Sequence, residues 1–282
     1  NTMKKPVAIP VEKLRPFAGH PFKVKDDEEM NTLIESIQTQ GILSPLIVRP
    51  IENTDEYEVV SGHRRLHAAQ KAGITEVPAL IYALDRDSAA IAVVDSNLHR
   101  EHILPSEKAF AYKLKRDAMA HQGRTSPQLG EKSLTVEKIG AETGDSKNQV
   151  LRYIRLTHLI PELLDLMDEG KIALMVGEAL SYLGDEEQYA VLEQCEINDC
   201  TPSYAQAVEM KKRYQDENLT AENISEILSR EKANQRETIK IPTEKLRKYA
   251  PNADAKQLED FIIKACEHYR KFLIRQRNRD ER

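Results

Sequence analysis

Residues 58–73 read EVVSGHRRLHAAQKAG, and this stretch decides how the N-terminal part of the chain folds. A short apolar run suited to a β-strand ends in a Ser-Gly pair, and a helix-favouring segment then continues to Gly73. A strand that turns through glycine into a helix gathers the unpaired N–H groups of that helix at one point, which suits an anion. Arg64 and Arg65 add positive charge, and Gly62 has no Cβ to keep a phosphate away. The stretch predicts a phosphate-binding strand–turn–helix; an ordinary strand-to-helix corner with solvated arginines is the alternative of equal weight.

Strand and helix patterns alternate around this stretch through the first hundred residues. Short apolar runs and amphipathic stripes are separated by turn residues, which indicates a small α/β unit. Asp26 or Asp27 is expected to begin the first helix and Gly41 to end it. The other expected elements are strands over residues 7–14, 42–49 and 78–84 and a helix over residues 87–98.

A polar segment, DSNLHRE, closes this unit at residues 95–101. Asp95 and Asn97 carry oxygen atoms of the kind that bind a hard cation such as Mg²⁺, and Arg100 has the charge to pair with a phosphate. The same residue types are common at a solvated helix end, and by themselves they favour that interpretation over a metal site. Pro105 then fits the first position of a further helix that is expected to run to about residue 121.

The clearest linker is GRTSPQLGEK, residues 123–132, because it combines Gly, Pro and Ser with almost no apolar side chain. Two short helical patterns follow on either side of Gly144, and the small Gly140 would let them pack closely. This spacing is typical of a helix-turn-helix whose core is formed by Ile139, Val150, Tyr153 and Ile154. Any compact helical hairpin is the alternative, but the small residue, the glycine turn and a polar second helix coincide here.

That second helix would present four side chains to a DNA groove. Their types read base edges and phosphates in the major groove. The predicted DNA-binding residues are Lys147, Asn148, Gln149 and Arg152.

Charge is distributed unevenly over the rest of the chain. Residues 161–199 contain eleven acidic residues and one lysine, so these helices are expected to face away from DNA. Residues 255–275 carry apolar side chains at three- and four-residue steps, which suits either self-association or packing on the preceding helix. The basic end of the chain would add non-specific DNA affinity or form a solvated tail.

The bulk composition excludes several classes of protein. The chain has 282 residues with a net charge of −5, which allows two or three domains and does not by itself indicate nucleic acid. Three cysteines without CxxC spacing make a zinc site improbable and suggest reduced thiols in the cytoplasm. No apolar run reaches the length of a membrane span, so no membrane partner is expected.

Together these motifs resemble the ParB family of DNA-partition proteins over residues 7–215. SGHRRLHAAQKAG resembles the family's GERR-type motif, and SNLHREHILPSEKAFAYK resembles its ENxxR motif with the helix that follows. LIPELLDLMDEGKIALMVGEAL resembles the stretch after the family's recognition helix. The implied fold is mostly helical and multidomain: a ParB/sulfiredoxin-like α/β nucleotide domain (residues 1–122), an all-α helix-turn-helix domain (residues 123–215) and a helical C-terminal segment (residues 216–282).

The resemblance implies a CTP-binding, Mg²⁺-dependent DNA clamp associated with the nucleoid or a plasmid. A homodimer would recognise a palindromic centromere-like site in double-stranded DNA, and a ParA-type ATPase is a further implied partner. Asn97 would bind Mg²⁺. The implied nucleotide-binding residues are Gly62, His63, Arg64, Arg65 and Arg100.

Two departures from the family pattern bear on catalysis. His63 and Ser96 stand where the family usually has glutamates, one linked to hydrolysis and one to the metal. Asp95 lies next to Ser96, but its position on a helix would point it elsewhere. We therefore expect nucleotide binding with weak CTPase activity at most.

Three other functions of related folds fit these residues less well. The related sulfiredoxin chemistry needs a cysteine beside its His-Arg pair, and none precedes Cys195. Free-serine kinases of the same superfamily need no helix-turn-helix, and a nuclease would need a carboxylate cluster. The remaining alternative is a nucleotide-independent repressor or accessory DNA-binding protein of a plasmid or conjugative element.

Overall fold

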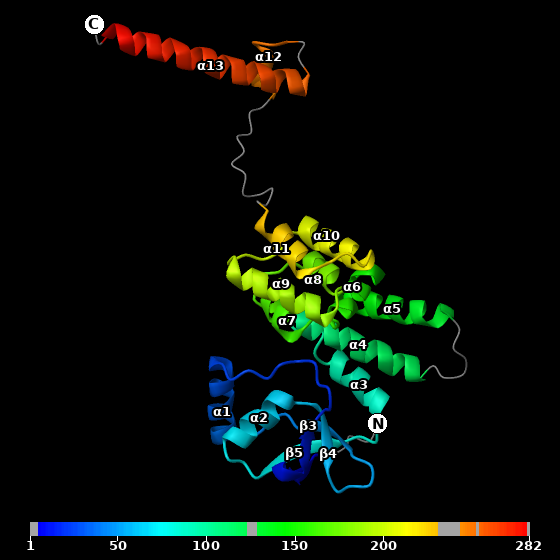
Figure 1. Ribbon diagram of the computed structural model, residues 1–282. Helices are drawn as coiled ribbons and strands as arrows, with labels where there is room; N and C mark the ends of the chain where they lie inside the picture. The colour runs from blue at the N-terminus through cyan, green and yellow to red at the C-terminus, as the bar shows by residue number, and fades with distance from the viewer. Residues whose placement is uncertain (1–4, 123–128, 231–242, 252–253, 281–282) are drawn as a thin grey trace. The chain divides into compact units, whose positions relative to one another are not determined.

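The computed structural model describes residues 5–122, 129–230, 243–251 and 254–280. The chain divides into two compact units, residues 1–230 and residues 231–282, and each is described by itself. The first unit begins with a small α/β domain and continues as helices only, as expected for the fold class (Figure 1). None of the helices in the described ranges is both long enough and apolar enough to cross a membrane.

A five-stranded sheet forms the centre of the α/β domain. Its strands are β1 (Val7–Pro10), β2 (Leu14–Pro16), β3 (Leu46–Pro50), β4 (Tyr57–Ser61) and β5 (Glu76–Ile81), in the order β1-β5-β3-β4-β2. β3 runs antiparallel to β4 and parallel to β5, while β1 and β2 pair with β5 and β4 at the two edges.

Successive residues of β4 point to opposite faces of the sheet, and each face has its own core. Val59 packs with Leu66 of α2 (His63–Lys71) in one core, and Val60 packs with Val93 of α3 (Arg86–Asp95) in the other. α1 (Glu28–Gln40) lies beside α2, and Asp27 begins it as expected, because its side chain accepts a hydrogen bond from Met30 N–H. The strand–turn–helix is thus held on both sides.

One predicted strand is wrong in its extent. Residues 7–14 were expected to form a single strand, but β1 ends at Pro10, a 3-10 turn follows over Val11–Lys13, and β2 starts at Leu14. The turn carries the chain from one edge of the sheet to the other, where Leu14 is buried against β4. The burial of Leu14 therefore depends on a pairing partner more than forty residues away.

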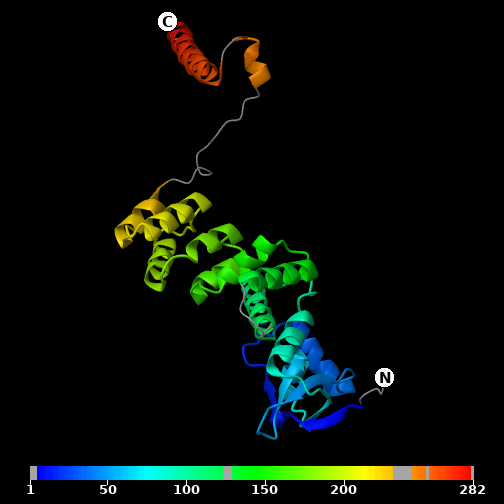
Figure 2. The same ribbon diagram turned by 90° about the vertical axis from the view of Figure 1, so that its right-hand side faces the viewer.

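The helical part of the first unit is built around α4 (Pro105–Gln122), which contacts α3 on one side and the helix-turn-helix on the other (Figure 2). The helix-turn-helix consists of α5 (Leu129–Thr143) and α6 (Lys147–Leu156). The largest apolar core lies beyond it, among helices α7 (Pro161–Asp168), α8 (Leu174–Leu180), α9 (Asp185–Ile197), α10 (Tyr204–Gln215) and α11 (Ala221–Ser229). α11 packs on α9 and α10, so residues 221–229 belong to the first unit.

Part of the predicted linker is helical. Residues 129–132 were assigned to the linker, but α5 begins at Leu129 and includes them. Residues 123–128 lie outside the described residues. The second unit contains α12 (Thr243–Arg247) and α13 (Ala255–Asp280), the helix expected from the apolar steps over residues 255–275.

Candidate functional site

The turn between β4 and α2 has the geometry that the sequence predicts. Gly62 lies directly before α2 with φ 104°, in the left-handed region that favours glycine. A Cβ at this position would lie 3.0 Å from Leu46 Cγ and 3.2 Å from Arg65 Nη2. The unpaired N–H groups of the first turn of α2 therefore open at a point that only glycine leaves clear.

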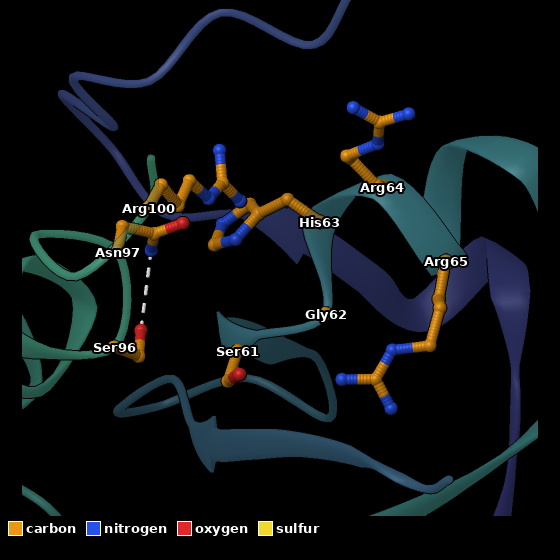
Figure 3. Close-up of a pocket in the computed structure, with 8 residues that line it drawn as sticks. All are labelled: Ser61, Gly62, His63, Arg64, Arg65, Ser96, Asn97 and Arg100. Atoms are coloured by element: carbon orange, nitrogen blue, oxygen red, sulfur yellow. Dashed lines mark hydrogen bonds between the residues drawn. The ribbon is translucent and has the colours of Figure 1, made fainter. Parts of the chain in front are cut away.

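A pocket of about 230 Å³ lies at this turn (Figure 3). Its lining joins the β4–α2 turn to the segment that follows α3, more than thirty residues further along the chain. The lining residues are Ser61, Gly62, His63, Arg64, Arg65, Ser96, Asn97 and Arg100. All six predicted nucleotide- and metal-binding residues are thus brought together, and Ser61 is a member that sequence reasoning missed.

Three arginines give the pocket its charge, and each is held differently. Arg64 is 3.2 Å from Glu29 Oε2 and 3.6 Å from Asp27 Oδ1, at the start of α1. Arg65 donates from Nη1 to the carbonyl oxygens of Ser44 and Pro45. Because no carboxylate belongs to the lining among the described residues, the arginines give the pocket the charge that an anion would need.

Burial acts on two of these guanidinium groups. It lowers the pKa of Arg65 from its usual value, and it is also the main cause of the lowered pKa of Arg100, to which the charge of Arg64 adds. Arg100 lies over the ring of Phe22, with 5.5 Å between its Cζ and the ring centroid. Positive charge that is partly desolvated binds an anion more strongly than charge in open water.

The side-chain oxygen atoms of the pocket, which could bind a metal ion, are uncharged. The amide Nδ2 of Asn97 donates to Val93 O at 2.8 Å and to Ser96 Oγ at 3.1 Å, so that its oxygen is directed towards Arg100 and His63 (Figure 3). Asp95 pairs with Lys115 of α4 and does not line the pocket, which agrees with the expectation that it points elsewhere. Mg²⁺ usually takes one or two carboxylates together with substrate phosphates. The pocket therefore fits Mg²⁺ only as an ion that arrives with a phosphate ligand.

His63 adds no positive charge to the pocket. Burial, the neighbouring His20 and Arg100 lower its pKa from 6.5 to about 3, so the imidazole is neutral at physiological pH. In the described ranges, no group of three or more His, Cys, Asp or Glu side chains is placed to hold a metal ion.

The predicted DNA-reading residues all lie on or at the start of α6. Ser146 precedes this helix and accepts a hydrogen bond from Gln149 N–H at 3.2 Å. Asn148 is exposed, Lys147 pairs with Glu137 of α5 at 2.9 Å, and Arg152 pairs with Glu178 of α8 at 3.1 Å. The opposite side of α6 is packed as expected, with Val150 and Ile154 buried beside Ile139 and Tyr153 partly buried.

Helix α4 connects the pocket region with the helix-turn-helix. Lys115 is 2% exposed at its side chain and pairs both with Asp95 of α3 and with Glu142 of α5. Lys108 pairs with Asp145, in the turn before α6, at 2.7 Å, and Tyr112 donates to the same carboxylate at 2.6 Å. These contacts, which the sequence patterns did not reveal, fix the orientation of α5 and α6 against the end of α3.

Comparison with known proteins identifies one family domain and several relatives of this chain. The family model of the ParB N-terminal domain matches residues 1–98. The chromosome-partitioning protein Spo0J of Thermus thermophilus is 35% identical over 183 residues, which cover 64% of this chain and 62% of that protein. A nucleoid occlusion protein of a Geobacillus species is 32% identical over 187 residues, covering 66% of this chain and 61% of that protein.

Two solved structures of a C-terminally truncated ParB from Caulobacter crescentus are also similar. The complex with the centromeric parS site has a TM-score of 0.41 at 23% identity and covers 79% of this chain and 98% of that chain. The complex with CTP-gamma-S has a TM-score of 0.32 at 28% identity and covers 67% of this chain and 97% of that chain. The chain spans a little over three fifths of the length of the curated relatives named above.

Proposed function

We propose that this chain, which matches the ParB N-terminal domain over residues 1–98, is a ParB-family protein: a sequence-specific DNA-binding protein of chromosome, plasmid or mobile-element partition that also binds CTP. The observation that carries the nucleotide part is the pocket itself. Three arginines, a helix N-terminus and a left-handed glycine converge on a space of about 230 Å³. A polyphosphate is the ligand that this combination suits, because its charge meets both forked donors and unpaired N–H groups.

Each pocket residue has a distinct role in this proposal. Arg64, Arg65 and Arg100 bind phosphate oxygens. Gly62 lets the phosphates of the ligand approach the N-terminus of α2. Asn97 Oδ1 would hold a Mg²⁺ ion that the triphosphate brings, which lowers the repulsion between phosphates. The choice of cytidine comes from the resemblance of the two motifs, since the pocket residues account only for the anion.

The DNA part rests on α6. Asn148 is exposed and Lys147, Gln149 and Arg152 are partly exposed, while Val150 and Ile154 anchor the helix in the core. A helix of this kind enters the major groove with its N-terminal half against base edges. A dimer would place two such helices on the two halves of a palindromic site.

The two sites would act together as a clamp. α4 packs against α3, which ends at the pocket, and against α6, which reads DNA. A ligand that shifts α3 therefore acts directly on the placement of α4. CTP would promote contact between two N-terminal domains, so that the dimer closes around DNA at the nucleoid or on a plasmid. Since His63 is neutral and no carboxylate lines the described pocket, we expect CTP hydrolysis to be slow.

Calorimetry of CTP binding, with and without cognate DNA, tests this function. We expect CTP to bind and Arg64→Ala to abolish that binding while DNA affinity stays nearly intact, because Arg64 lines the pocket and pairs with Asp27 and Glu29 rather than with the helix-turn-helix. Arg15→Ala is the matched control, since Arg15 is an exposed arginine of the same domain that pairs with Glu56 outside the pocket.

Two results would change the conclusion. Absence of CTP binding in the wild-type protein, with sequence-specific DNA binding retained, would identify a nucleotide-independent repressor or accessory protein. Loss of both CTP and DNA binding in Arg64→Ala would contradict two separate sites.

A further inference from the structure

The loop between β2 and α1 contacts His63, one of the residues that line the pocket. Phe17 N–H donates to Nε2 of His63 at 3.3 Å, and the ring of His20 stacks on the ring of His63 with 3.7 Å between centroids and 32° between planes. His20 itself does not line the pocket. The loop also contacts Arg100 of the lining through the ring of Phe22, but His20 acts on the ligand space through His63.

The contact with Phe17 determines which nitrogen of His63 carries a proton. The imidazole is neutral because its pKa is lowered to about 3, and a neutral imidazole has one N–H and one acceptor nitrogen. Since Nε2 accepts from a backbone N–H, the proton is on Nδ1. A protonated imidazole would turn an N–H towards the N–H of Phe17, so the loop disfavours that form as well.

Nδ1 of His63 has no partner of its own in the described part of the chain. A single side-chain nitrogen or oxygen there is both buried and without a hydrogen bond, and it is Nε2 of His20. Nδ1 of His63 is therefore accessible, and His63 lines the pocket. His63 thus has an N–H donor that is open to a ligand of the pocket.

His20 is held in a conformation that is unfavourable for its own polar atoms. Its Nδ1 lies 2.8 Å from Phe22 O and must donate, so Nε2 is an acceptor that stays buried and unpaired. Burial, more than the nearby Arg100, lowers the pKa of His20, while Glu107 of α4 opposes the change. A buried unpaired acceptor destabilises a fold, and the stacking contact with His63 is a favourable contact that this ring makes in return.

We propose that His20 is a positioning residue of the phosphate pocket: its stacked ring and the Phe17 N–H hold His63 as a neutral imidazole whose Nδ1–H donates to a phosphate oxygen. This inference rests on the nucleotide-binding function proposed above and adds a residue that does not touch the ligand. A hydrogen bond to a charged oxygen changes affinity by about tenfold or more, which sets the size of the expected effect.

Two substitutions of His20 separate its ring from its hydrogen bond. His20→Phe keeps a ring to stack on His63, whereas His20→Asn keeps a donor near Nδ1 for Phe22 O and removes the ring. We expect His20→Asn to weaken the binding of both CTP with Mg²⁺ and inorganic tripolyphosphate by about tenfold, and His20→Phe to stay within about threefold of wild type. His67→Asn is the control, because His67 is on the same helix but bonds to Asp26 at 2.8 Å outside the pocket.

The ¹⁵N shifts of the His63 imidazole supply a readout that a purely structural role would not change. They should show a single Nδ1–H tautomer in the wild type and in His20→Phe, and a tautomer mixture in His20→Asn. If His20→Asn does not fold, His63→Asn and His63→Gln replace it. The former keeps an amide near Nδ1 and should bind CTP more tightly than the latter.

Calorimetry distinguishes a failure of this inference from a failure of the proposed function. Equal CTP affinity in the wild type and in a folded His20→Asn variant, or a wild-type His63 tautomer with the proton on Nε2, would overturn the positioning role alone. No binding of CTP or tripolyphosphate by the wild type would overturn both proposals.

Discussion

Arg152 lies on α6 with its Nε 3.1 Å from Glu178 Oε2, so it must leave this carboxylate to contact DNA. We expect Arg152→Ala to weaken cognate binding by about 1–3 kcal/mol if the side chain reads a base. Fluorescence anisotropy with cognate and scrambled duplexes measures the difference. Glu178→Gln is the paired control and should strengthen binding, because it frees Arg152 and removes a negative charge. Equal weakening of Arg152→Ala on both duplexes would assign Arg152 to phosphate.

His63 makes stability depend on pH at acid values. Its pKa is about 3 in the folded protein and 6.5 when unfolded, so the unfolded chain binds the proton first. The contribution to the free energy of unfolding is complete above pH 6.5 and decreases as pH falls, by about 2 kcal/mol at pH 5. Denaturant unfolding at pH 7 and pH 5 should therefore show a smaller loss of stability in His63→Gln than in the wild type.

A matched variant checks that this pH effect belongs to His63. Ser61→Ala should keep the wild-type pH dependence, because Ser61 lines the same pocket but has no group that titrates between pH 5 and pH 7. An unchanged pH dependence in His63→Gln would show that other groups dominate the acid response.

At the scale of single elements, the approach of α5 to the turn before α6 depends on one missing side chain. A Cβ at Gly140 would lie 2.4 Å from the carbonyl oxygen of Asp145, which is backbone and cannot move alone. We expect Gly140→Ala to lower stability by about 1–3 kcal/mol and to weaken DNA binding while CTP affinity is kept. Thermal unfolding and the two binding assays check this.

Ala141→Ser is the control on the same helix, because residue 141 is exposed and should tolerate the change. DNA binding by Gly140→Ala at the wild-type level would mean that the helix-turn-helix angle does not limit recognition.

At the scale of the whole molecule, the first unit has its own cores within residues 5–230. The second unit exposes apolar side chains along α13, including Phe261 (37% exposed), Tyr269 (62%) and Phe272 (50%). A chain ending at Arg230 should therefore keep its thermal midpoint and CTP affinity but lose dimerisation, as measured by light scattering. A fall in midpoint of more than about 5 °C would show that the first unit needs the second.

Local sequence patterns were enough to predict the elements whose conformation depends on a few neighbouring residues. The β4–Gly62–α2 turn, the Asp27 cap, the position of Gly144 and the core side of α6 follow from residues within a few positions of one another. The mostly helical, multidomain fold class was implied by the family resemblance, and the element order agrees with it. The single strand expected over residues 7–14 failed because its second half pairs with β4, a partner that local propensity does not identify.

The amino-acid sequence alone thus determined the strand–glycine–helix turn at Gly62 and the polar side of α6, because backbone conformation and helical periodicity are local properties. Only the tertiary structure decided that Lys115 is the partner of Asp95 and that His20 stacks on His63, and it placed Asn97 and Arg100 in one pocket with Gly62, which the resemblance had only implied. Those outcomes depend on how helices pack on the two faces of one sheet. Packing joins residues far apart in the chain, so no local pattern records it.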